Sequence, residues 1–242
     1  MAKIKVIVCE NYEEISKVAA SVMADVIKNK PDCVLGLATG STPEGMYQNL
    51  VKMNESGEIS FKDVKTVNLD EYYPIAPDND QSYRYFMNTH LFDHVDIDKN
   101  NTNVPDGTAS DPDAESERYE KVIESLGGVD IQVLGIGRNG HIAFNEPDDA
   151  LVPDTHVTDL TEDTIKANSR FFEKEEDVPT RALTMGIGSI LRAKKIIILA
   201  SGASKKDAIS KLLCGKVSTS CPASFLNLHS DVTLICDSAV LE

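Results

Sequence analysis

Short apolar runs alternate with longer segments of mixed polarity along most of this chain. A short run of apolar or β-branched residues that ends at glycine, proline or a polar cluster is typical of a buried strand. On this pattern we expect strands at residues 5–9, 33–38, 65–69, 131–135, 182–185, 195–199 and 232–236.

The segments between these runs predict helices. Asn11 is a suitable N-cap for a helix over residues 12–29, because its side-chain oxygen can accept from free backbone N–H groups of the first turn. Further helices are expected from Pro43 through Met53 and over residues 82–92, 112–126 and 204–213. Residues 160–172 carry mixed polarity, which favours a short exposed helix; a plain connecting helix is the simpler interpretation and a lid the alternative.

Strands that alternate with helices predict an α/β fold. We expect an open, mostly parallel, twisted sheet of the Rossmann-like kind, with helices on both faces. The chain has 242 residues, of which 41% are hydrophobic, and no break in composition or repeat divides it. We therefore expect one domain over residues 1–242.

The acidic balance narrows the classes of partner. The formal net charge is −15, whereas non-specific binding to nucleic acid or to an anionic membrane needs a basic face. We therefore expect neither as a partner. An anionic small molecule stays compatible with the sequence, because local cations and backbone amides can override the global charge.

Cysteine usage and the first residues bear on the compartment. Cys9, Cys33 and Cys236 stand inside apolar runs and are expected to be buried reduced thiols. Residues 1–5 lack the apolar core of a secretion signal, and no apolar run reaches membrane-spanning length. We expect a cytoplasmic protein.

The richest segment for chemistry is the loop at residues 135–147, which follows the expected strand 131–135. Three glycines, at positions 135, 137 and 140, precede His141, with Asn139 two residues before it and Glu146 five residues after it. A carboxylate or amide that accepts from one imidazole nitrogen fixes the tautomer and leaves the other nitrogen free for proton transfer. The alternatives are a hydrogen-bonded loop histidine or a metal ligand, and metal is disfavoured because no second histidine or cysteine follows at ligand spacing.

Two other strand ends carry polar residues. Residues 39–43 read Thr-Gly-Ser-Thr-Pro and open a helix, which is a suitable cradle for phosphate or an ordinary helix cap. The motif lacks the lysine of a Walker A loop. Asp70 follows the strand at residues 65–69, where partial desolvation can raise its basicity; an N-cap or a surface acid is the alternative.

Cations come late in the chain. Arg170 lies in Asn-Ser-Arg-Phe-Phe at residues 168–172, and Lys205 closes Ser-Gly-Ala-Ser-Lys at residues 201–205. Both could complete a phosphate site begun by Ser41 and Thr42; taken singly, each is an ordinary surface charge.

At these residues the chain resembles the glucosamine-6-phosphate deaminases (isomerases). The matching blocks keep the family's order and lie at residues 35–43, 68–72, 140–147, 167–172 and 201–205. The block Gly-His-Ile-Ala-Phe-Asn-Glu-Pro at residues 140–147 is the most specific of them. The Thr-Gly-Ser-Thr-Pro block is shared with 6-phosphogluconolactonases and discriminates less.

The resemblance implies a sugar-phosphate isomerase type of fold and an activity. D-glucosamine 6-phosphate would be converted to D-fructose 6-phosphate and ammonia in amino-sugar catabolism, by ketol-isomerase chemistry with hydrolysis of a C–N bond and no metal or organic cofactor. His141, oriented by Glu146, would open the pyranose ring, and Asp70 would move a proton from C2 to C1. The implied catalytic residues are Asp70, Asn139, His141 and Glu146. The implied substrate- and phosphate-binding residues are Gly40, Ser41, Thr42, Ala143, Arg170 and Lys205.

Two departures from the family pattern matter. Asn139 stands where some members carry aspartate, which affects the expected pH profile. Allosteric members have a longer C-terminal tail and basic residues where residues 155–158 read Thr-His-Val-Thr. We therefore expect no activation by N-acetylglucosamine 6-phosphate, and a monomer, with a homo-oligomer as the alternative.

Two other functions stay open at this point. One is a 6-phosphogluconolactonase or another phosphosugar isomerase on the same fold. The other is a sugar-phosphate-binding regulator without catalysis, although the acidic charge and the absence of a helix-turn-helix extension count against it.

Overall fold

The computed structural model of the protein describes residues 4–169, 172 and 178–241. The strands are β1 (Lys5–Cys9), β2 (Val34–Leu37), β3 (Lys65–Asn68), β4 (Asp70–Tyr73), β5 (Thr102–Asn103), β6 (Ile131–Leu134), β7 (His156–Asp159), β8 (Arg181–Thr184), β9 (Ile196–Ala200) and β10 (Val232–Asp237). The α-helices are α1 (Tyr12–Asn29), α2 (Ser41–Glu55), α3 (Tyr83–Met87), α4 (Pro112–Ser125), α5 (Glu162–Asn168), α6 (Ile187–Leu191) and α7 (Lys206–Leu213). Within the described residues, every strand and helix expected from the sequence is present, with ends that shift by a few residues at most; residues 170 and 171 of the expected helix 160–172 lie outside them.

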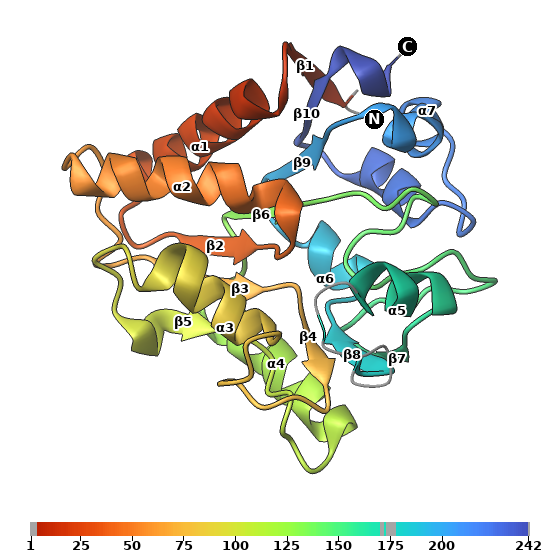
Figure 1. The fold of residues 1–242 in the computed structure, drawn as a ribbon, viewed down its shortest axis with the longest axis horizontal. Helices are drawn as coiled ribbons and strands as arrows, with labels where there is room; N and C mark the ends of the chain where they lie inside the picture. Colours follow the sequence, from red (N-terminus) through yellow and green to blue (C-terminus); the bar gives the residue numbers. More distant parts are fainter. Residues whose placement is uncertain (1–3, 170–171, 173–177, 242) are drawn as a thin grey trace.

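Seven strands form the central sheet in the order β1-β10-β9-β6-β2-β3-β5, and all of its neighbouring strands are parallel (Figure 1). The apolar runs of β2, β6, β9 and β10 are buried along their whole length. Strand β1 lies at an edge and leaves Val8 53% exposed. The predicted α/β fold with a mostly parallel open sheet is therefore confirmed.

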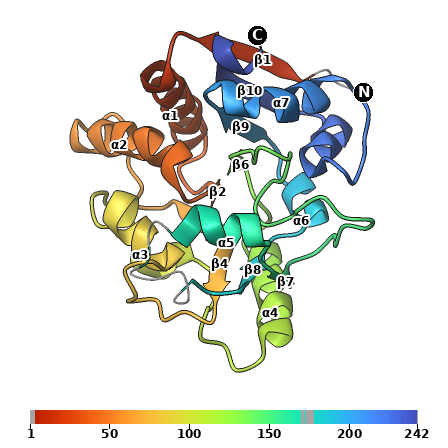
Figure 2. The ribbon, with the colours of Figure 1, turned by 45° about the vertical axis from the view of Figure 1, so that its right-hand side comes forward.

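Helices cover this sheet on opposite faces. The connections through α1, α2 and α3 run in one direction along the strand order, and those through α4, α6 and α7 run in the other. Because crossovers between parallel strands are right-handed, the two groups lie on opposite sides of the sheet. Figure 2 shows α1 and α2 on one side and α6 and α7 on the other.

A second, smaller sheet changes the position of one predicted strand. Strands β4, β8 and β7 form an antiparallel sheet in that order, so the expected strand at residues 182–185 does not join the parallel sheet. Only Leu69 separates β3 from β4, so the chain passes directly from one sheet into the other. Asp70, the first residue of β4, therefore lies where the two sheets meet.

Local side chains explain several helix ends. Asn11 Oδ1 accepts from the backbone N–H of Glu14 at 3.0 Å, which confirms Asn11 as the N-cap of α1. The segment 82–92 begins as α3 and ends in a π-helical turn at Asn88–Phe92. The segment 204–213 begins in a 3₁₀ turn, Ala203–Lys205, before α7.

The prediction of buried thiols is confirmed for three cysteines. Cys9, Cys33 and Cys236 are buried and are not in disulfides, as expected. Burial raises the pKa of the Cys33 thiol to about 12, so this thiol is un-ionised at neutral pH.

Within the described ranges, every helix is too short or too polar to cross a membrane.

Candidate active site

Four neighbouring strands of the parallel sheet deliver the predicted site residues from their carboxyl ends. Strands β9, β6, β2 and β3 are consecutive in the sheet order. The chain after β2 turns to the face that carries α2, whereas the chain after β6 returns toward β9 on the opposite face. This reversal between β2 and β6 is a topological switch point, where open α/β sheets form a ligand crevice.

The segment after β2 has the geometry of an anion cradle. Gly40 has φ +84°, a left-handed conformation that favours glycine, and α2 begins at the next residue, Ser41. The fifteen residues of α2 place a positive helix end at Ser41 and Thr42. Gly135, which follows β6, is so close that an added Cβ would lie 3.9 Å from Thr42 Oγ1. The cradle and the histidine loop are therefore adjacent.

Asp70 is a buried carboxyl group at this edge of the sheet. It is 6% exposed and pairs in the ladder of the second sheet with Thr184. Burial, with a smaller effect from the neighbouring Glu71 carboxylate, raises the pKa of Asp70 to about 8. A carboxylate with such a pKa is a stronger base than an ordinary surface aspartate.

Glu71 itself is held in place by backbone donors. The N–H groups of Tyr83 and Arg84, at the start of α3, donate to its two carboxylate oxygens at 2.8 and 2.9 Å. Burial raises the pKa of Glu71 to about 7, although these hydrogen bonds act in the opposite direction. The two adjacent acids thus have different environments, and only Glu71 has its carboxylate saturated by backbone donors.

The histidine loop orients an imidazole beside a carboxylate. His141 Nδ1 lies 3.0 Å from Glu146 Oε1, although the ring N–H is not aligned well enough to form a regular hydrogen bond. A Cβ at Gly137 would overlap the imidazole ring, so this position requires glycine. The His141 side chain is 31% exposed and Glu146 is 15% exposed. The imidazole of His141 is thus partly accessible to a ligand.

Glu146 receives two further donors. Asn139 Nδ2 donates to Glu146 Oε2 at 2.5 Å, and Thr164 Oγ1 on α5 donates to Oε1 at 3.0 Å. Burial alone would raise the pKa of Glu146, but these contacts and His141 outweigh it and keep that pKa below its ordinary value. Glu146 is therefore a carboxylate at neutral pH.

The rest of the loop is locked to the second sheet. Ala143 has φ +51°, an uncommon conformation for a residue with a side chain. The next residue, Phe144, donates its backbone N–H to Thr184 Oγ1 at 3.1 Å, and Asn145 Nδ2 donates to Met185 O at 2.8 Å. Because Thr184 also pairs with Asp70, one residue connects the buried acid to the histidine loop.

Lys205 follows β9 at the end of the 3₁₀ turn. Burial, and then the positive charge of Arg138, lower the pKa of Lys205. Arg138 belongs to the histidine loop, so two cations from different loops are close enough to repel each other. An anion bound between them would relieve this repulsion. Arg170, the other predicted cation, lies outside the described residues.

The structure thus brings together Asp70, the Asn139–His141–Glu146 group and the Gly40–Thr42 cradle on consecutive strand ends. Sequence reasoning missed Thr164, Thr184 and Arg138. Thr164 stands in the Leu-Thr-Glu-Asp-Thr segment that only predicted an exposed helix. Among residues 4–169, 172 and 178–241, no group of three or more histidine, cysteine or acidic side chains could hold a metal ion.

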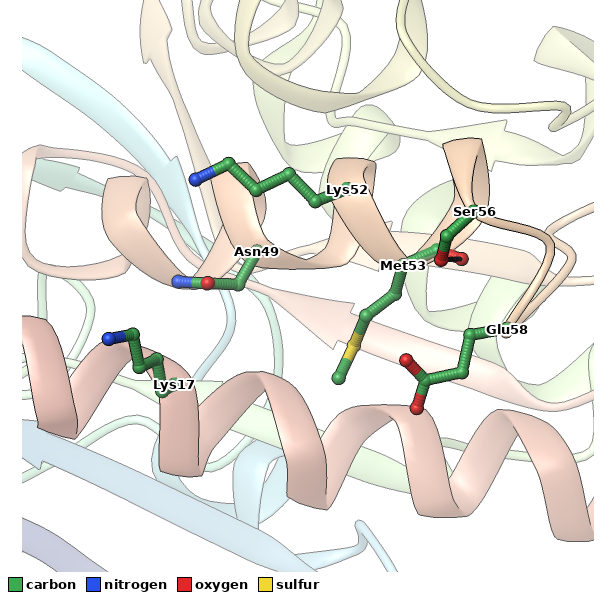
Figure 3. A pocket seen from close by; sticks show the side chains of 6 residues that line it. All are labelled: Lys17, Asn49, Lys52, Met53, Ser56 and Glu58. Atoms are coloured by element: carbon green, nitrogen blue, oxygen red, sulfur yellow. Dashed lines mark hydrogen bonds between the residues drawn. The ribbon is translucent and has the colours of Figure 1, made fainter.

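Two cavities are lined by other residues of the chain. The first, about 230 Å³, lies between α1 and α2 and carries Lys17 and Lys52 toward one end and Glu58 at the other (Figure 3). Lys17 pairs with Glu13 at 2.7 Å and Glu58 with Lys28 at 2.8 Å. The second, about 330 Å³, is lined by Glu71, Arg84 and the loop around Gly107. Neither is lined by any of the predicted site residues.

Comparisons with known proteins identify the family of the chain. A family model for glucosamine-6-phosphate isomerases/6-phosphogluconolactonase matches residues 10–235. The glucosamine-6-phosphate deaminase of Clostridium beijerinckii is 55% identical over 233 residues, which cover 96% of each protein. That of Bacillus velezensis is 53% identical over 232 residues, again 96% of each.

Solved structures show the same relationship. A monomeric glucosamine-6-phosphate deaminase superposes with a TM-score of 0.95 at 50% identity and covers 98% of both chains. The 6-phosphogluconolactonase of Trypanosoma cruzi has a TM-score of 0.80 at 23% identity, over 99% of this chain and 97% of that one, which is a likeness of fold alone. The chain therefore belongs to the family of glucosamine-6-phosphate isomerases and 6-phosphogluconolactonases.

Proposed function

We propose that this protein is a glucosamine-6-phosphate deaminase, which converts D-glucosamine 6-phosphate and water to D-fructose 6-phosphate and ammonia. Two relatives of that name, those of Clostridium beijerinckii and Bacillus velezensis, are 55% and 53% identical over nearly their whole lengths. The observation that carries the proposal is the connection through Thr184, which joins the buried Asp70 to the loop of His141 and Glu146. This arrangement supports two separate proton transfers at one bound sugar.

The His141–Glu146 pair is suited to ring opening. Glu146 is ionised and holds the Nδ1 side of the ring, which leaves Nε2 to act on the substrate. In the proposed step His141 takes the proton of the anomeric hydroxyl and delivers it to the ring oxygen. The C1–O5 bond breaks and an aldehyde forms at C1. Asn139 and Thr164 act as positioning residues through Glu146.

Asp70 is suited to the isomerisation. Its carboxylate removes the proton at C2, which is acidic because the C1 aldehyde takes up the resulting negative charge, and the C1 oxygen takes a proton from solvent to complete the enolamine. The carboxyl group of Asp70, whose proton exchanges with solvent while the enolamine is bound, then delivers a proton to C1, and this gives an imine at C2. Water adds to the imine and ammonia leaves, so the step is formally the hydrolysis of a C–N bond. A base with a pKa of about 8 is close to the pH at which such transfers are efficient.

The phosphate group of the substrate would bind at the start of α2, beside the histidine loop. Gly40, Ser41 and Thr42 offer backbone and hydroxyl donors at the positive end of α2, and Lys205 adds a cation. Arg170 is proposed to close this site, with Arg138 as a further cation. Ala143 lines the sugar. An anchor remote from the reacting carbons orients the substrate and so lowers the barrier without taking part in the chemistry.

The reaction as written needs no cofactor, since every step moves a proton or adds water and no electrons are exchanged. We further propose that the protein acts in amino-sugar (N-acetylglucosamine) catabolism in the cytoplasm and as a monomer. The similarity to a monomeric deaminase supports the last point. Strand β7 (His156–Asp159) contains neither lysine nor arginine, which supports the expected insensitivity to N-acetylglucosamine 6-phosphate.

A coupled assay of ammonia release from D-glucosamine 6-phosphate tests the proposal. Purified protein should release ammonia and D-fructose 6-phosphate in equal amounts, with a hyperbolic substrate curve that N-acetylglucosamine 6-phosphate does not shift. Turnover of 6-phosphogluconolactone without ammonia release would instead support the lactonase. Binding of the phosphosugar without any turnover would support a regulator that lacks catalysis.

A further inference from the structure

The next strand along the sheet, β10, brings one more acid to the same edge. β10 lies beside β9 in parallel, with Cys236 opposite Ala200, and ends at Asp237. The Asp237 residue is 9% exposed. Its position continues the row of strand ends that supplies Lys205, His141, Thr42 and Asp70. Asp237 takes no part in the proposed proton transfers.

The Asp237 carboxylate holds the turn that leads from β9 to Lys205. Ser201 Oγ donates to Asp237 Oδ2 at 2.6 Å. The backbone N–H of Gly202 donates to the same oxygen at 2.9 Å. Gly202 has φ +86°, and the 3₁₀ turn Ala203–Lys205 begins directly after it. The Gly202 N–H also approaches Asp237 Oδ1 at 3.3 Å, so donors from two residues hold one carboxylate and fix the point from which the Lys205 segment starts.

These contacts outweigh an electrostatic cost. A buried carboxylate is unfavourable unless it is hydrogen-bonded, and its negative charge near an anion site opposes phosphate binding. A charged acceptor, however, forms shorter and stronger hydrogen bonds than a neutral one. The benefit of an aspartate here is thus the fixed geometry of the turn rather than its charge.

We propose that Asp237 is a positioning residue for phosphate recognition, which holds the Ser201–Gly202 turn so that the Lys205 ammonium faces the phosphate of the substrate. This inference rests on the proposed function in one respect, the assignment of Lys205 to the phosphate. It adds that the affinity for phosphate depends on a residue that does not touch the ligand.

The test compares four variants with the wild-type protein. Asp237→Ala removes the acceptor of all these hydrogen bonds, Asp237→Asn keeps one acceptor oxygen, and Ser201→Ala removes only the hydroxyl donor. Asp231→Ala is the matched control, because Asp231 lies at the opposite end of β10 and pairs with Lys195 at 2.8 Å. Lys205→Met serves to check the phosphate assignment itself. The measurements are KM, kcat, the Kd of inorganic phosphate by titration calorimetry, and Tm.

Asp237→Ala should raise both KM and the Kd of phosphate about tenfold, the loss expected for a charged hydrogen bond, with kcat within about twofold of wild type. Ser201→Ala should give a smaller rise, Asp237→Asn an intermediate one, and Asp231→Ala none. A lower Tm alone, or a loss of kcat with unchanged phosphate affinity, would overturn the proposal.

Lys205→Met separates this inference from the proposed function. If it weakens phosphate binding while Asp237→Ala and Ser201→Ala do not, the positioning role is wrong and the phosphate site stands. If none of the variants changes phosphate binding, both assignments are wrong. If D-glucosamine 6-phosphate is not turned over but the phosphate Kd responds to Asp237, the proposed function fails and the positioning role stands.

Discussion

Asn139 donates its side-chain amide to Glu146 across 2.5 Å, on the oxygen opposite the one that faces His141. Asn139 Oδ1 also accepts the backbone N–H of His141 at 3.1 Å. The amide thus acts in both directions, as a donor to the carboxylate and as an acceptor for the loop. An ionised aspartate at this position could accept the backbone N–H of His141 but could not donate to Glu146.

Asn139→Asp should therefore disturb Glu146 directly. Two carboxylates at this distance cannot both ionise easily, so the pKa of Glu146 should rise from below its ordinary value to above it. The titration of Glu146 followed by ¹³C NMR of its side-chain carboxyl group measures this change. An unchanged titration would mean that Asn139 does not control the charge of Glu146.

The pKa of Asp70, raised to about 8, sets the pH dependence of activity. Only the carboxylate form can remove the C2 proton, so kcat/KM should fall as the pH drops through about 8, with a limiting slope of one proton. A profile of kcat/KM from pH 5.5 to 9.5 measures this. A flat profile between pH 6 and 9 would contradict Asp70 as the base with this environment.

The same shift predicts an effect on stability. The folded state keeps a proton on Asp70 up to about pH 8, whereas an unfolded aspartate loses it near pH 4. Stability is therefore lost as the pH rises from about 4 to about 8. Asp70→Asn removes this loss, so it should raise the free energy of unfolding by a few kcal/mol at pH 8 and by little at pH 4.

Urea unfolding at the two pH values measures this difference. Asp231→Asn is the control, because Asp231 is an exposed partner of Lys195. Equal effects of Asp70→Asn at both pH values would show that the carboxyl group is not protonated in the folded protein.

Thr164→Val should lower kcat about tenfold with little change in KM, because it removes a hydrogen bond to a charged carboxylate. Valine keeps the shape of threonine, so the packing of α5 should be preserved. Thr158→Val on β7 is a matched control, since its hydroxyl only approaches Asp159 O at 3.4 Å. Steady-state kinetics of both variants decide the point, and equal kcat values would exclude a role for Thr164.

The parallel sheet and its loops could be predicted because they leave a local signal. Buried parallel strands are continuous apolar runs, as in β9 and β10, and each functional loop starts with glycine or a polar cluster. His141 and Glu146 are five residues apart, so their contact needs only a tight turn.

The second sheet could not be predicted in this way. Strand β4 reads Asp-Glu-Tyr-Tyr, without an apolar run, and is stabilised by antiparallel pairing with β8, more than a hundred residues later. The run at β8 predicts a strand, but neither segment alone indicates that the two strands pair. The contact of Thr184 with the histidine loop depends on the second sheet, and that of Thr164 with Glu146 depends on the position of α5. Both contacts therefore appear only in the three-dimensional structure.

The movement of the C2 proton tests the central claim most directly. In ²H₂O, the wild-type protein should exchange the C2 proton of D-glucosamine 6-phosphate with solvent and place solvent deuterium at C1 of the D-fructose 6-phosphate product, as followed by NMR. Asp70→Asn should still bind the phosphosugar but should give neither exchange nor product. Exchange at the wild-type rate in Asp70→Asn would contradict the account, because the base would then have to be another group.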